Sequence, residues 1–160
     1  EPSCILSFRD DYLDLLGDDD KVRTVSSNVM LFEEFILRVM DDYGGSLPFR
    51  DREGQILFHG HCHQKALVGT AAAMEVLRAI PGCQPDEINS GCCGMAGAFG
   101  FQKEHFDISM GIGEESLFPA IRSQSEKVTV VSEGVSCRQQ IEDGTGRLAK
   151  HLVEVLADVL

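Results

Sequence analysis

Two adjacent cysteines flanked by glycines are the residues of this sequence with the clearest chemical potential. They are Cys92 and Cys93, in the stretch 90-SGCCGMAG-97, and the chain has only six cysteines in 160 residues. Adjacent cysteines are poor disulfide partners, because the ring they would close distorts the peptide between them. Gly91 and Gly94 would weaken a helix or strand interior. The stretch is therefore predicted to be a loop that wraps closely around a bound group.

The elements that must position this loop alternate between strands and helices. Apolar runs predict strands over 55–59, 86–90 and 127–132. Helical periodicity predicts helices over 5–16, 31–40, 65–80, 106–121 and 148–159. Ser27 or Asn28 is expected to cap the second helix, and 143–146 is expected to be a turn. Such alternation implies βαβ units, and hence an α/β fold with a mostly parallel sheet.

Four cysteines come after predicted strands. Cys62 follows the first strand, Cys92 and Cys93 follow the second, and Cys137 follows the third. Carboxyl ends of parallel strands share one edge of the sheet, so these four thiols are predicted to converge there. Each is also expected near a helix N-terminus, where free N–H groups favour the thiolate that metals bind.

Composition limits the partners and the compartment. With 14 Lys and Arg against 26 Asp and Glu, the net charge is −12, which argues against nucleic acid as a partner. The acidic run of Asp10, Asp11, Asp14 and Asp18–Asp20 is interpreted as a solvated helix face rather than a metal site. No apolar run approaches about 20 residues, so membrane contact is expected to be peripheral at most.

A cytoplasmic location with reduced thiols is expected, with the inner face of the cell membrane as a place of peripheral contact. The chain begins at Glu1-Pro2 rather than at Met, and no signal peptide is visible. It is therefore expected to be one domain, 1–160, cut from a larger multidomain protein.

Several segments resemble a known family. The stretches 61-HCHQK-65, 91-GCCGMAG-97 and 136-SCRQQI-141 are similar to the cysteine-rich CCG domain, which occurs in heterodisulfide reductase and in the iron-sulfur subunits of glycolate oxidase. The likeness is closest to the C-terminal region of fused FAD and iron-sulfur oxidases of the D-lactate dehydrogenase type. It covers nearly the whole chain, including 109-SMGIGEESLFPA-120.

The resemblance implies a Rossmann-like three-layer domain whose cysteines lie at the C-terminal strand edge. It implies an electron-transfer module that binds an iron-sulfur cluster and serves a flavin-dependent oxidoreductase acting on a 2-hydroxy acid such as lactate or glycolate. Partners would be flavin and ferredoxin-like domains, with FAD held outside this chain. The chain alone would have no turnover, and whether it counts as an enzyme stays open.

The resemblance also implies a ligand set, with one departure. Cys62, Cys92, Cys93 and Cys137 match the family's motif, but Gly134 stands where the first cysteine of a closing Cys-x-x-Cys belongs. Four thiolates suit a [4Fe-4S] cluster or zinc. A short likeness between 3-SCILSFRD-10 and 136-SCRQQIED-143 makes Cys4 a further candidate cofactor ligand.

Other groups near the motifs have candidate supporting roles. Those that could contact the site or a substrate are His61, His63, Lys65 and Arg138. Lys65 and Arg138 could hold an anion, lower a thiol pKa or form surface salt bridges. The residues interpreted as structural are Cys83, His59 and Met95. The sequence indicates no functional role for His105 and His151.

Two other functions remain open for this sequence. The domain could be a zinc-binding structural or interaction module without redox activity. Thiol–disulfide chemistry at Cys92 and Cys93 is the third interpretation, disfavoured because the chain has no Cys-x-x-Cys.

Overall fold

The computed structural model describes residues 1–17 and 19–160, and within them it shows an α/β fold on a four-stranded parallel sheet. The strands are β1 (Gly54–His59), β2 (Cys83–Glu87), β3 (Thr129–Ser132) and β4 (Ala149–Lys150), in the spatial order β2-β1-β3-β4. All neighbouring strands run parallel. The Rossmann-like, three-layer fold expected from the sequence is confirmed.

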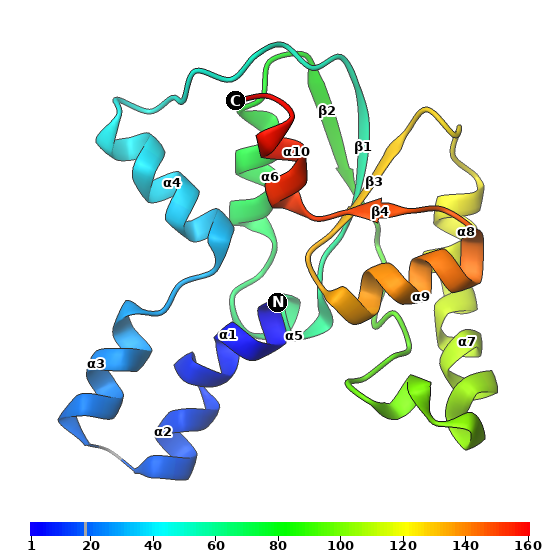
Figure 1. The fold of residues 1–160 in the computed structure, drawn as a ribbon, viewed down its shortest axis with the longest axis horizontal. Coiled ribbons are helices and arrows are strands. Elements are labelled where there is room, and N and C mark those ends of the chain that lie inside the picture. Colours follow the sequence, from blue (N-terminus) through cyan, green and yellow to red (C-terminus); the bar gives the residue numbers. More distant parts are fainter. Residues whose placement is uncertain (18) are drawn as a thin grey trace.

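Helices precede the sheet and connect its strands (Figure 1). Their bounds are α1 (Pro2–Arg9), α2 (Asp11–Leu16), α3 (Asp20–Asn28), α4 (Phe32–Asp42), α5 (Cys62–Leu67), α6 (Ala71–Arg78), α7 (Phe106–Glu115), α8 (Leu117–Arg122), α9 (Val135–Thr145) and α10 (Leu152–Ala157). Short 3₁₀ turns, η1 (Phe99–Phe101) and η2 (Lys103–His105), lead into α7.

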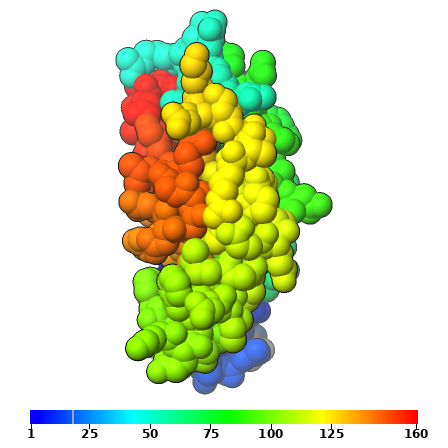
Figure 2. All heavy atoms as spheres, turned by 90° about the vertical axis from the view of Figure 1, so that its right-hand side faces the viewer, coloured from blue at the N-terminus to red at the C-terminus, as the bar shows by residue number. Residues whose placement is uncertain are grey.

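Two hydrophobic cores sandwich the sheet. Ile56 and Phe58 of β1 pack on one face with α4, α6 and α10. Leu57, between them, packs on the other face with α8 and α9. Successive side chains of a strand point to opposite faces, so β1 is apolar throughout because helices cover both sides of it. Figure 2 shows α8 in yellow and α9 in orange, side by side over the second face.

The order of the strands creates a switch point between β1 and β3. After β1 the chain passes through α5 and α6 to β2 on one side, and after β3 it passes through α9 to β4 on the other. The two strands pair directly, with His59 opposite Ser132 at their carboxyl ends. In such sheets ligands bind in the crevice where neighbouring connections diverge.

Three of the predicted helices are each two helices, and a fourth is shorter than predicted. The helix predicted over 5–16 is α1 and α2, and the one predicted over 106–121 is α7 and α8. The helix predicted over 148–159 begins at Leu152, because 149–150 form β4. The helix predicted over 65–80 begins earlier, at Cys62, and is interrupted after Leu67. Gly69 has a φ of +76°, and the N–H groups of Val68 and Gly69 both donate to the carbonyl of Gln64. This left-handed glycine closes α5 before α6 begins, which periodicity alone did not predict.

Other boundaries also differ from the sequence predictions. The strand predicted at 86–90 lies at 83–87, and the turn predicted at 143–146 is the end of α9. Ser27 and Asn28 end α3 instead of capping α4, whose first free N–H, at Leu31, donates to the Glu34 carboxylate. Of the acidic run, Asp18 lies outside the described residues.

No helix among the described residues is both long and apolar enough to cross a membrane.

Candidate metal centre

Loops at the carboxyl edge of the sheet carry the cysteines of interest. Cys62 is the first residue of α5, directly after β1, and Cys137 is the third residue of α9, after β3. Cys92 and Cys93 lie in the irregular segment that follows β2 and do not begin a helix. The expectation of a helix N-terminus thus holds for Cys62 and Cys137 but is wrong for the adjacent pair.

The four thiols are close enough to shift one another's pKa values. A hydrogen bond to Cys92 raises the pKa of the Cys62 thiol. Hydrogen bonds from Cys62 and Cys93 lower the pKa of Cys92. A hydrogen bond from Cys93 lowers the pKa of Cys137 to about 5 and raises that of Cys93 itself. The pKa shifts of Cys92 and Cys137 are toward the thiolate, which is the form in which sulfur binds metals.

A histidine that the sequence analysis interpreted as structural belongs to this cluster. A ring nitrogen of His59 lies within 4.8 Å of the Sγ atoms of both Cys93 and Cys137. The His59 Nδ1 is 2.9 Å from the Ser90 hydroxyl, while its buried Nε2 has no oxygen or nitrogen as a hydrogen-bond partner. After the hydrogen bond from Cys93, a hydrogen bond with His59 also lowers the pKa of the Cys137 thiol. His59 is a buried core residue, as interpreted from the sequence, but it also lies beside the thiols and has a ring nitrogen available as a ligand.

Glycines allow the close packing of this edge. A Cβ on Gly94, whose φ is +104°, would overlap the backbone oxygen of Ser109. A Cβ on Gly134 would lie 2.6 Å from the His61 ring and 2.9 Å from the Cys137 sulfur. The position expected by resemblance to hold another cysteine thus has no space for a side chain in this arrangement.

His61 and His63 organise the start of α5. The His61 Nδ1 accepts a hydrogen bond from the His63 backbone N–H at 3.2 Å, which caps the helix. The backbone N–H of His61 donates to the Gln64 side chain at 3.2 Å, and its Nε2 is 3.6 Å from a Glu1 carboxylate oxygen. The His63 backbone N–H also lowers the pKa of Cys62, although hydrogen bonding to Cys92 is the larger effect and raises it.

The side chains of Lys65 and Arg138 donate hydrogen bonds to backbone carbonyl groups of the neighbouring loops. The Lys65 ammonium donates to the backbone oxygens of Ser90 and Gly91, the latter at 3.1 Å. The Arg138 guanidinium donates to the oxygens of Ser132 and Glu133 at 3.1 and 2.9 Å. Both cations therefore position the ends of β2 and β3 on either side of the thiols.

The remaining cysteines lie elsewhere. Cys83 begins β2, at the opposite edge of the sheet, and packs against the core formed with α6 and α10. Cys4 is exposed on α1. Met95 is buried in the second core, as the sequence indicated.

The donor set suits a soft or borderline metal. Its close group consists of two sulfurs and an imidazole nitrogen, from buried Cys93, Cys137 and His59, and the thiols of Cys62 and Cys92 are neighbours of this group. Thiolates and imidazole are the ligands of zinc and of iron-sulfur clusters, whereas magnesium and calcium prefer oxygen. The His59 Nε2, which has no oxygen or nitrogen partner, and the crowded thiols are what such a group would satisfy, so the residues fit it.

The sequence of this chain is similar to parts of known dehydrogenases. It is 32% identical over 158 residues to one subunit of the anaerobic glycerol-3-phosphate dehydrogenase of Escherichia coli K12, covering 99% of this chain and 39% of that protein. It is 29% identical over 162 residues to the D-2-hydroxyglutarate dehydrogenase of the same strain, covering 100% of this chain and 15% of that protein. The Pseudomonas putida D-2-hydroxyglutarate dehydrogenase is 26% identical over 157 residues.

The chain therefore spans about two fifths of the first of these relatives and about a seventh of the others. No family model matches the chain, and no solved structure matches it. The relatives are oxidoreductases, as the sequence indicated, and one group of them is named for a 2-hydroxy acid. The CCG domain itself is not named by any family model.

Proposed function

We propose that this chain is an electron-transfer module that holds an iron-sulfur cluster for a flavin-linked dehydrogenase. The observation that carries the proposal is the close group of His59, Cys93 and Cys137, whose donor atoms lie within 4.8 Å of one another, with Cys62 and Cys92 as neighbouring thiols. The similarity to dehydrogenases and to one subunit of such an enzyme supports it. Electrons would come from a flavin domain acting on a hydroxy substrate, and the chain alone would have no turnover.

The ligands we assign are Cys62, Cys92, Cys93 and Cys137. A bound [4Fe-4S] cluster would supply one-electron transfer at this edge. The chain's own contribution is to bury Cys93 and Cys137, to hold the strand ends with Lys65 and Arg138, and to keep other side chains out at Gly134. Exclusion of water and hydrogen bonding around the sulfurs are the features by which a protein sets a cluster's potential.

Zinc is the second candidate, and one observation favours it. Donor atoms of His59, Cys93 and Cys137 lie within 4.8 Å of one another. Ligands of one tetrahedral zinc ion lie about 3.5–3.8 Å apart, given metal–ligand distances of about 2.0–2.3 Å. A single ion therefore fits this group with little rearrangement, and the chain would then be a structural or interaction module.

Anaerobic reconstitution separates the two candidates. The chain is incubated with iron and sulfide or with zinc, desalted, and its bound metal is measured together with visible absorbance and EPR of the reduced sample. We expect iron and sulfide to be retained with broad visible absorbance and an EPR signal. A colourless protein that keeps zinc in preference to iron would overturn the electron-transfer assignment.

Serine variants locate the ligands. Cys92→Ser and Cys93→Ser should lose most of the bound metal, because a hydroxyl is a poor ligand for soft metals. Cys83→Ser, at the other edge of the sheet, and Cys4→Ser, on exposed α1, should keep it. If Cys4→Ser lost iron while remaining folded, Cys4 would have to be added to the ligand set.

A further inference from the structure

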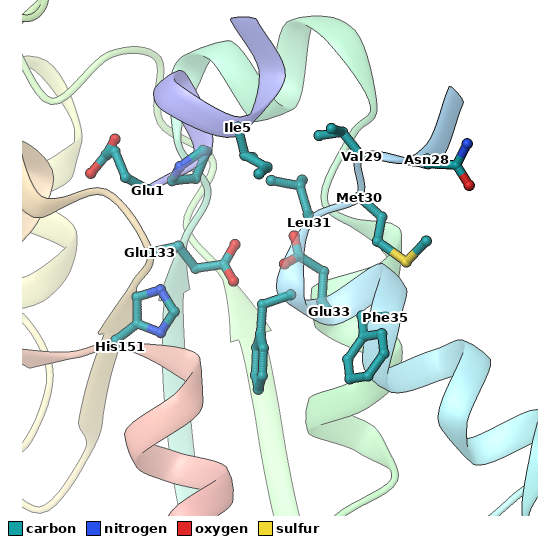
Figure 3. A pocket seen from close by; sticks show the side chains of 12 residues that line it. Glu1, Ile5, Asn28, Val29, Met30, Leu31, Glu33, Phe35, Glu133 and His151 are labelled. Atoms are coloured by element: carbon teal, nitrogen blue, oxygen red, sulfur yellow. The ribbon is translucent and has the colours of Figure 1, made fainter. Parts of the chain in front are cut away.

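A cavity outside the cysteine cluster lies between the N-terminal helices and the sheet. Its volume is 560 Å³, within the range of small-molecule sites. Figure 3 shows it between α1, the segment leading into α4, and the end of β3. Most of its lining is apolar, from Pro2, Ile5, Val29, Met30, Leu31, Phe32 and Phe35.

Two buried carboxyl groups form the polar end of this cavity. Glu33 of α4 is 1% exposed, and Glu133, just after β3, is 2% exposed. Figure 3 shows their carboxyl groups pointing toward each other. The Gln64 side chain donates to the Glu33 Oε1 and, at 2.9 Å, to the Glu133 Oε2. The Glu33 Oε2 is buried and accepts no hydrogen bond from an N–H group or a hydroxyl, and the two carboxyl groups interact as a hydrogen-bonded pair.

These carboxyl groups have no cationic side chain as a partner among the described residues; the side chain that donates to both of them is neutral Gln64. Burial, joined by repulsion from Glu33, raises the pKa of Glu133 to about 9, and burial raises that of Glu33. The pair therefore keeps a proton near pH 7, and a bound cation would take the place of that proton.

His151 adds a hydrogen-bond donor but not a charge. Its Nδ1 accepts a hydrogen bond from the Val153 backbone N–H at 3.0 Å, so the neutral ring carries its proton on Nε2. Burial lowers the pKa of His151, which keeps it neutral near pH 7. The cavity therefore combines an acidic end, a neutral imidazole and an apolar wall.

We propose that this cavity binds an organic primary ammonium ion with an apolar body, its nitrogen on the Glu33–Glu133 pair. The ammonium group donates to the buried Glu33 Oε2, and the body lies against Ile5, Leu31 and Phe35. Three N–H donors suit two carboxyl groups that face each other, and the ring of Phe35 adds a cation–π surface.

Two other ligand classes fit less well. An anion, such as the carboxylate or phosphate of a dehydrogenase substrate, would meet the acidic pair and a chain of net charge −12. A metal ion would need three or more close donors, and among the described residues the group that meets this spacing is at the cysteine cluster instead. The proposal stands apart from the electron-transfer assignment, because it uses none of the cysteine ligands.

Calorimetry with matched ligands tests the charge requirement. The whole chain is titrated with 4-phenylbutylamine, 4-phenylbutan-1-ol and 4-phenylbutanoate, which share an apolar body and differ in the head group. We expect the amine to bind at least about tenfold more tightly than the alcohol, as one charge-assisted hydrogen bond provides, and the acid not to bind. Equal binding of amine and alcohol would overturn the proposal, as would displacement of the amine by magnesium chloride at millimolar concentration.

Variants and NMR locate the site. Glu33→Gln should weaken amine binding about tenfold or more, while Glu126→Gln, at an exposed position, should leave it unchanged. Methyl-labelled methionine gives a readout that needs no variant. The amine should shift the Met30 signal, which lines the cavity, and leave that of Met95, in the second core, in place. An amine that shifts both signals equally, or neither, would contradict the assignment.

Discussion

At the scale of single residues, Gly134 shows why the chain departs from the ligand pattern suggested by the family resemblance. The residue is the N-cap of α9, and the place of its absent side chain is taken by the His61 ring and the Cys137 sulfur. A longer residue there could not simply add a ligand, because it would first displace one that is present. The glycine is thus part of the site's geometry, beside the close group of His59, Cys93 and Cys137.

Gly134→Ala tests this close approach. The added methyl group must push the His61 ring or the Cys137 thiol, so we expect several-fold weaker metal binding in a folded protein. Helix capping should also lose about 1 kcal/mol, since alanine is a poor N-cap residue. Chelator competition measures the affinity, and circular dichroism reports the fold.

Gly111→Ala in α7 is the matched control. A Cβ there meets nothing within 4 Å, so the change should leave metal affinity intact and stabilise the helix by about 0.5–1 kcal/mol. Equal effects of the two substitutions on metal affinity would mean that Gly134 has no special role.

At the scale of elements, the central strands could be predicted and the edges could not. β1 and β3 are apolar runs buried on both faces, which periodicity identifies. β2, with the sequence CQPDE, lies at the edge of the sheet and contains Pro85, so no apolar pattern marks its start. β4 has only two residues, and the break at Gly69 depends on a left-handed backbone.

The candidate site could also be predicted only in part. Cysteines at the ends of strands could be placed together by the rule of parallel sheets. His59 could not, because an Nε2 without an oxygen or nitrogen partner depends on neighbours brought by other strands. Glu133 comes directly after β3, so the same rule could have placed it at this edge. Its partner Glu33 is 100 residues away in the sequence, and no sequence pattern links the two.

Helix α5 also holds the loop that carries the adjacent cysteines, through the side chain of Lys65. Its ammonium holds the carbonyl groups of Ser90 and Gly91, immediately before the adjacent cysteines. Lys65→Met keeps the apolar stem and removes the donor, so we expect the loop to loosen and metal to dissociate several-fold faster. The loss corresponds to about 1 kcal/mol for a partly exposed charged donor.

Lys127→Met, at an exposed position before β3, provides the comparison. Both variants should unfold at nearly the same temperature when metal is absent. If Lys65→Met released metal no faster than Lys127→Met, the lysine would not be what holds the loop.

At the scale of the whole molecule, the cysteine cluster and the acidic cavity share two segments of the chain, the start of α5 and the residues just after β3. Gln64, two residues after Cys62, donates to both carboxyl groups, and Glu133 directly precedes Gly134. Both sites use the switch point between β1 and β3, one through thiols and the other through carboxyl groups. Because this chain covers only part of its relatives, the longer proteins offer further segments that could contact either site.

The acidic pair should also dominate the pH dependence of folding in the metal-free chain. Burial, joined by repulsion from Glu33, raises the pKa of Glu133 from 4.5 to about 9, and a hydrogen bond from Gln64 opposes part of that rise. The native state then keeps a proton that the unfolded chain releases. Its stabilising effect is complete below about pH 4.5 and is lost as pH rises toward about 9, with a slope of up to about 1.4 kcal/mol per pH unit.

Glu133→Gln removes that titration while keeping an amide that can bond to its neighbours. Urea unfolding of the metal-free chain between pH 5 and 9 should therefore show a falling free energy of unfolding for the wild type and a flatter profile for the variant. The two should be closest in stability at the acidic end, where the wild-type carboxyl is already neutral. Glu126→Gln should follow the wild-type curve, since that residue is exposed. Parallel curves for the wild type and Glu133→Gln would show that Glu133 is ionised in the folded protein, and the carboxyl pair would then need a cation that the described residues do not supply.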